Sequence, residues 1–160
     1  MGGDVANGLE KLRVELRRWR HDGELRLTEL ATGDPAGFLP LLHFVLLQAS
    51  VEIARWIVHT GYELTAKSDL RFVETVYRLA RQELNYNPIL TSKQFFATGF
   101  AERKLQMLTE LSALCRSKHA DLVRERAMGR KGSSMAAEHQ AGGSQTLATP
   151  RRRVRATSCG

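Results

Sequence analysis

Histidine and cysteine are the residue types most often used for metal binding and proton transfer, and their spacing in this chain predicts neither. The five histidines lie at scattered positions, and the two cysteines are Cys115 and Cys159. Cys115 and His119 are one helical turn apart, but a zinc site needs three or four ligands. The sequence also lacks the GxSxG, HExxH and phosphate-loop motifs. We therefore expect no enzyme, no cofactor and no bound metal.

The basic residues offer a different chemistry, the attraction of an acidic polymer. Six of them are candidates for a microtubule- or partner-binding surface: Lys67, Arg71, Arg78, Arg81, Arg103 and Lys104. The three central arginines share one side of a predicted helix, and the last two residues begin another. If these helices pack side by side, the cations form one patch suited to tubulin or nucleic acid. The alternative is an ordinary solvated face, because Glu74, Glu83 and Glu102 are interspersed.

Phe95 and Phe96 are candidates for a partner-binding groove. Aromatic residues at helical spacing usually belong to a core. Two adjacent residues of one helix cannot both point directly inward, however, so we expect one of this pair to reach the surface.

The positive charge is concentrated at the C-terminal end. Of the net charge of +7, residues 1–128 carry +2 (18 basic against 16 acidic) and residues 129–160 carry +5 (6 against 1). A nearly neutral body argues against a basic nucleic-acid-binding domain. Residues 127–160 are rich in Gly, Ser and Arg, and are predicted to be a disordered basic tail.

The body is predicted to be an all-α domain over residues 7–126. Apolar residues recur at helical spacing, and no window alternates as a half-buried strand does. Seven helical segments are expected, the last over about residues 101–126. The predicted N-caps are Asn7, Asp34, Ser50, Ser68 and Ser92, and the predicted terminating glycines are Gly23, Gly33, Gly61 and Gly99. In the helix after Ser50, Ile53, Ile57 and Val58 are expected to face the core.

The most apolar segment, residues 38–48, is too short to span a bilayer, because about 20 apolar residues are needed. The two cysteines fit free thiols in a reducing compartment. We therefore expect a cytoplasmic protein with no membrane partner and no small-molecule substrate.

Several blocks of sequence resemble a known family. They are GDPAGFLPLL (33–42), AKSDLRFVETVYRL (66–79), NYNPILTSKQF (85–95) and GFAERK (99–104). In order and spacing they are similar to the N-terminal domain of the forty-four-kilodalton centrosomal protein family, across roughly residues 9–120.

The resemblance implies a calponin-homology-like helical fold, microtubule binding, and residence in the cytoskeleton at centrosomes, centrioles and spindle poles. It also implies a role in centriole integrity and in converting centrioles into centrosomes, with a centriolar WD40-repeat protein as partner.

Three functional hypotheses follow. The first is a microtubule-binding module that uses the cationic residues. The second is a protein–protein scaffold domain that binds a centriolar partner without touching microtubules. The third, ranked below both, is nucleic-acid binding through the tail; deleting residues 129–160 should then eliminate binding, because the nearly neutral body should retain none.

Overall fold

The computed structural model describes residues 3–65 and 68–141, with side chains described as far as residue 130. Every regular element in these ranges is helical, which confirms the predicted all-α class. The calponin-homology-like arrangement stays an expectation from the resemblance. The chain divides into two units, residues 1–120 and 121–160, and the first unit contains the core.

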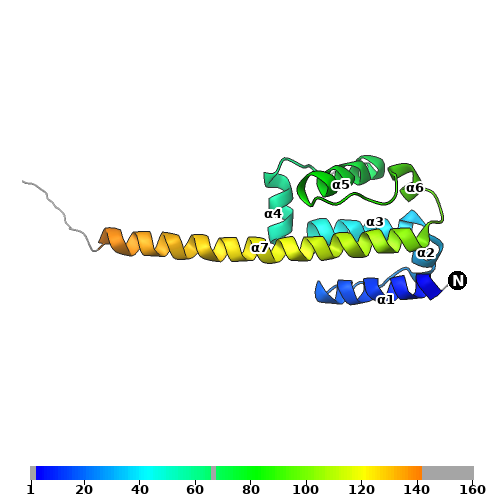
Figure 1. The fold of residues 1–160 in the computed structure, drawn as a ribbon, viewed down its shortest axis with the longest axis horizontal. Helices are drawn as coiled ribbons and strands as arrows, with labels where there is room; N and C mark the ends of the chain where they lie inside the picture. The colour runs from blue at the N-terminus through cyan, green and yellow to red at the C-terminus, as the bar shows by residue number, and fades with distance from the viewer. Residues whose placement is uncertain (1–2, 66–67, 142–160) are drawn as a thin grey trace, which may run out of the picture. The chain divides into compact units, whose positions relative to one another are not determined.

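Seven α-helices and one π-helical turn make up the described chain (Figure 1). They are α1 (Gly3–Arg18), α2 (Leu27–Thr32), α3 (Pro35–His43), η1 (Phe44–Gln48), α4 (Val51–His59), α5 (Asp69–Glu83), α6 (Ser92–Phe96) and α7 (Ala101–Ala141).

Three of the five predicted N-caps are confirmed. The side chains of Asp34, Ser50 and Ser68 accept hydrogen bonds from backbone N–H groups in the first turns of α3, α4 and α5. The prediction that Asn7 caps the first helix is wrong, because α1 already begins at Gly3. The prediction that Ser92 is an N-cap is also wrong. The cap of α6 is Thr91, whose hydroxyl and the Gln94 side chain form a reciprocal capping box.

The last helix is longer than predicted. Whereas the sequence analysis ends it at residue 126, α7 continues to Ala141, through part of the predicted disordered tail. Residues 142–160 lie outside the described residues. A helix satisfies its own backbone hydrogen bonds and can continue without burying apolar area, and residues 124–128 are mostly good helix formers.

Within residues 1–120, the core forms around the first part of α7. Each α-helix contributes a fully buried side chain: Leu12, Leu30, Phe38, Ile53, Phe72, Phe95 and Leu105. Gly8 of α1 lies against Leu105, and just past the end of α1 the Trp19 indole donates to Ser112 at 2.9 Å. The two helices therefore run parallel, and Figure 1 shows α1 and α5 on different sides of α7.

A sharp corner joins α3 to α4. In η1 the Ala49 N–H donates to the Phe44 carbonyl at 2.8 Å, which is the wider hydrogen-bonding step of a π-helix. The helical segment Pro35–Gln48 then meets Val51–His59 at an angle of 85°. Within the described residues, no single helix has the length and apolar composition to cross a membrane. Only the two helical segments of this bent pair, taken together, have both the length and the composition.

Candidate interaction surfaces

The outward side of α5 is the most cationic surface that the sequence analysis predicted. Arg71, Arg78 and Arg81 are exposed, whereas Phe72 and Val76 on the other side of the helix are buried. The Ser68 cap fixes the start of α5 and therefore which residues face outward. The structure thus brings three of the six predicted cations onto one helical face, which we call the α5 arginine face.

None of these three arginines makes an ion pair within the described residues. One acid, Glu74, is exposed on the same side of the helix, so the stripe of four charged residues carries a net +2 (three basic, one acidic). The Arg78 guanidinium lies 5.7 Å from the centre of the Tyr62 ring, a cation–π contact that orients it. The face is therefore positively charged without an internal counter-ion network.

The other predicted cations lie elsewhere. Lys67 is outside the described residues. Arg103 is exposed in the first turn of α7, where it lines a hollow of about 370 Å³ together with Val5 of α1, Phe100 and Glu102. Arg81 lines a different hollow, beside residues 88–92. Because Lys67 lies outside the described residues, the merging of the exposed cations into one patch stays a prediction.

The prediction that Lys104 belongs to an exposed surface is wrong. Its side chain is fully buried, and its ammonium donates hydrogen bonds to the carbonyl oxygens of Gly33 and Ala97. The same ammonium lies 6.0 and 5.8 Å from the rings of Phe38 and Phe95. Burial lowers the pKa of Lys104, and this is opposed by the nearby Asp34 carboxylate. Lys104 therefore joins three chain segments inside the domain.

The prediction that Phe95 lines a partner groove is also wrong, because its ring is fully buried. Phe96 is partly exposed and meets the Phe95 ring edge-on at 5.4 Å between centroids. The expectation that only one of the two adjacent rings points inward is confirmed. Phe96 stays a candidate contact residue.

Within residues 1–120, the most exposed of the large apolar residues lie on α4, where the sequence analysis did not place them. Val51 and Val58 are 59% and 72% exposed, so the prediction that Val58 faces the core is wrong. Ile53 and Ile57 are buried as predicted. Helix α4 therefore has apolar residues on two sides, whereas a helix that only packs on the core needs one apolar side.

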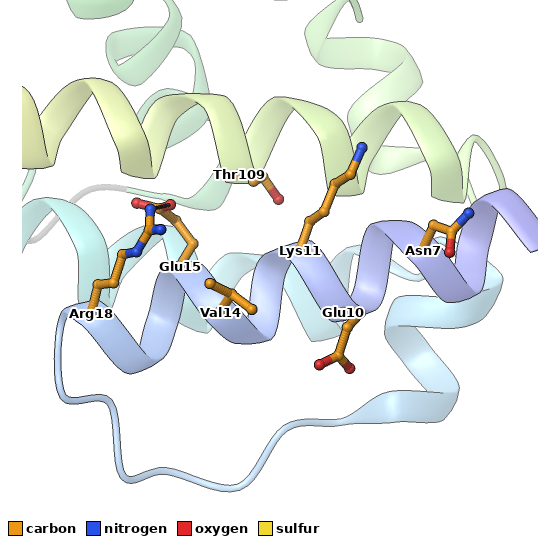
Figure 2. Close-up of a pocket in the computed structure, with 7 residues that line it drawn as sticks. All are labelled: Asn7, Glu10, Lys11, Val14, Glu15, Arg18 and Thr109. Carbon is orange, nitrogen blue, oxygen red and sulfur yellow. Dashed lines mark hydrogen bonds and ion pairs between the residues drawn. The ribbon is translucent and has the colours of Figure 1, made fainter.

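A hollow of about 440 Å³ lies between α1 and α7 (Figure 2). Figure 2 shows Lys11 extending from α1 toward α7, and the side chains of Glu15 and Arg18 lying close together. The Glu15 carboxylate is nearly buried and accepts hydrogen bonds from Arg116 at 2.6 and 3.1 Å and from Arg18 at 3.3 Å. Because both oxygens are occupied, this carboxylate holds the two helices together and is poorly placed to transfer protons.

Cys115 and His119, one helical turn apart on α7, have separate structural environments. Burial raises the pKa of the Cys115 thiol to about 12, so it stays protonated and inert. The His119 Nδ1 instead lies 2.7 Å from the Ser50 hydroxyl, which caps α4. No group of three or more metal-ligating side chains occurs within the described residues.

Comparison with known proteins decides the family. The family model described as "Centrosomal spindle body, CEP44" matches residues 4–129, which include most of the described helices. The chain belongs to this family. The matched range contains the α5 arginine face, the buried Lys104 and the exposed side of α4.

Similar curated proteins carry the same description. The chain is 40% identical over 120 residues to the centrosomal protein of 44 kDa of Bos taurus, which covers 75% of this chain and 31% of that protein. It is 38% identical over 121 residues to the Xenopus laevis protein (76% and 32%), and 38% identical over 120 residues to the Homo sapiens protein (75% and 31%). The chain thus spans about a third of the length of these CEP44 relatives.

Membership of the CEP44 family supports a centrosome-associated function for this chain and favours a structural role over a catalytic one. The exposed surfaces described above are therefore candidates for protein contacts.

Proposed function

We propose that this CEP44 domain is a non-enzymatic microtubule-binding module of the centrosome. In this proposal it contributes to centriole integrity and to the conversion of centrioles into centrosomes, at centrioles and spindle poles within the cytoskeleton. The observation that carries the proposal is the α5 arginine face, on which Arg71, Arg78 and Arg81 are exposed and make no ion pair within the described residues.

Electrostatics explain how such a face would act. Tubulin is an acidic polymer, and each exposed arginine contributes a modest, salt-screened attraction to it. Three such contacts are worth about 1–2 kcal/mol together, or roughly 5- to 30-fold in Kd. The face would therefore orient and accelerate docking, with shape complementarity of the surrounding surface supplying the remaining affinity.

Co-sedimentation with microtubules tests this proposal. The variant Arg71→Gln/Arg78→Gln/Arg81→Gln removes three charges while keeping polar, unbranched side chains of similar helix propensity. A matched control, Arg13→Gln/Arg26→Gln/Lys93→Gln, makes the same change in net charge at exposed positions outside α5. We expect the first variant to lose roughly 5- to 30-fold in affinity and the control to lose less than about twofold.

Salt provides a second readout. Raising the ionic strength from 0.1 to 1 M shortens the screening length from about 10 to about 3 Å, so pelleting of the wild-type chain should weaken steeply. Pelleting that is insensitive to salt, or equal losses in the two triple variants, would contradict a role for the α5 arginine face.

A second candidate function is a scaffold domain that binds a centriolar WD40-repeat protein without contacting microtubules. It is favoured by the partly exposed Phe96 and by the exposed apolar residues that precede and follow α6 in the chain, Ile89 and Phe100, at 42% and 43% exposure. In that case Phe96→Ala should abolish capture of the WD40-repeat protein, and the arginine variants should leave it unchanged.

A further inference from the structure

Helix α4 presents a second apolar side to solvent. Its buried side packs Ile53 and Ile57 into the core. On the exposed side, Val51, Ala54 and Val58 follow one another at spacings of three and four residues and form a single stripe. Val58 is 72% exposed and Val51 59% exposed, the highest values for large apolar residues in the unit formed by residues 1–120.

This stripe is one wall of a hollow of about 490 Å³, which we call the α4 groove. Its lining residues are Leu47, Gln48, Val51, Ala54, Arg55, Val58 and His59. The π-helical turn η1 supplies the first two, at the 85° corner where α4 begins. π-turns inside helices are frequent at functional sites, because they change the direction in which side chains point.

The charge at the α4 groove indicates what could cover it. Arg55 is exposed and makes no ion pair within the described residues. No acidic residue lines the groove, and its other ionisable side chain is His59. An occupant that buries the valines would therefore bring Arg55 out of water, and a carboxylate on the occupant would compensate that cost.

A second copy of the chain fits this groove poorly. Two α4 helices packed antiparallel, with Val51 of each against Val58 of the other, would place the two Arg55 side chains beside the symmetry axis, where they repel.

We propose that the α4 groove binds one amphipathic helix of a partner protein. This helix carries apolar residues at positions i, i+3 or i+4, and i+7, with an aspartate or glutamate beside them that pairs with Arg55. The valines and Leu47 supply the apolar contact, and Arg55 selects an acidic helix over a basic one. The site is separate from the α5 arginine face, so the inference does not depend on microtubule binding.

A designed peptide pair tests this inference with the full chain. The probe is a synthetic helical peptide of about 15 residues with leucines at i, i+4 and i+7 and two flanking glutamates, and its matched control has lysines in place of the glutamates. We expect the NMR signals of Val51, Ala54 and Val58 to shift on titration with the glutamate peptide. The lysine peptide should bind at least about fivefold more weakly.

The variant Val58→Asp should weaken glutamate-peptide binding at least about tenfold, because it places a charge in the apolar contact. Its side chain is exposed, so folding should be unaffected, which circular dichroism checks. The matched control is Leu70→Asp on α5, an apolar residue that is 51% exposed and outside the groove, and it should bind the peptide normally. Microtubule pelleting should be equal for Val58→Asp and the wild-type chain.

Several results would overturn the inference. They are no shift in the groove signals, equal affinity for the two peptides, and equal loss in the two variants. Self-association that Val58→Asp abolishes would assign the groove to a second copy instead. Vesicle binding that the same variant abolishes would assign it to a lipid surface.

Discussion

Lys104→Met should destabilise the domain strongly, even though it replaces a charged residue by an apolar one of similar length. The Lys104 ammonium is buried and donates to the carbonyl oxygens of Gly33 and Ala97. Methionine leaves both carbonyls without their donor. The variant therefore removes the contact that joins the end of α2, the segment after α6 and the first part of α7.

The expected magnitude comes from two opposing effects. A hydrogen bond from a charged donor contributes about 1.5–3 kcal/mol, so losing two costs about 3–6 kcal/mol. Removing a buried charge recovers part of this cost, because burial already disfavours the charged form and lowers the pKa of Lys104. We expect a net loss of about 2–4 kcal/mol in the free energy of unfolding.

Urea unfolding followed by circular dichroism measures this loss, with Arg103→Met as the control. Arg103 is the preceding residue and is exposed, so its replacement should change the free energy of unfolding by less than about 0.5 kcal/mol. If Lys104→Met were as stable as the Arg103 control, the internal role of Lys104 would be refuted, and its place among the surface cations would be open again.

Three further predictions test the fold. Gly33 has a φ of +79°, and an added Cβ would lie 2.0 Å from a backbone oxygen, whereas Gly61 has a φ of +94° and open space around it. Thermal unfolding should show Gly33→Ala to cost at least about 3 kcal/mol and Gly61→Ala about 1 kcal/mol; equal costs would contradict the close approach. Ser50→Ala removes a helix cap and a contact with a histidine of α7, so it should cost about 1–2 kcal/mol in chemical denaturation, against less than about 0.5 for the exposed Ser117→Ala. Because burial raises the pKa of Cys115 from 9.0 to about 12, the unfolded chain releases this proton first as the pH rises. The free energy of unfolding should therefore fall by about 1.4 kcal/mol per pH unit above pH 9. In Cys115→Ala this fall should begin at a higher pH, and the same pH profile in the variant and the wild-type chain would show that the buried thiol does not cause it.

Local sequence signals predicted the helices well, because capping and periodicity act over only a few residues. Asp34 followed by proline, Ser50 and Ser68 each satisfy backbone N–H groups of their own helix. The cap at Thr91 was missed in favour of the neighbouring Ser92. The reciprocal pair that Thr91 forms with Gln94 is a sequence signal that could have identified it.

The errors concern which side of a helix meets the core. Lys104 was grouped with Arg103 by charge, but it lies four residues before Leu108, on the buried stripe that continues to Leu111 and Cys115. That register is visible in the sequence. The two carbonyls that Lys104 binds are not, because they come from segments that only the tertiary fold brings together.

The exposed side of α4 was missed for a related reason. Most residues of its sequence VEIARWIVH are apolar, so periodicity alone does not say which of them face solvent. An excess of apolar residues over one core-facing stripe was the available sign of a second contact surface.

A cryo-electron microscopy reconstruction of microtubules decorated with this chain tests the central proposal most directly. We predict that α5 faces the lattice, with Arg71, Arg78 and Arg81 at the contact and the α4 groove left accessible. The proposal would be contradicted by a reconstruction in which α5 points away from the lattice. It would also be contradicted if the chain did not decorate microtubules at low salt.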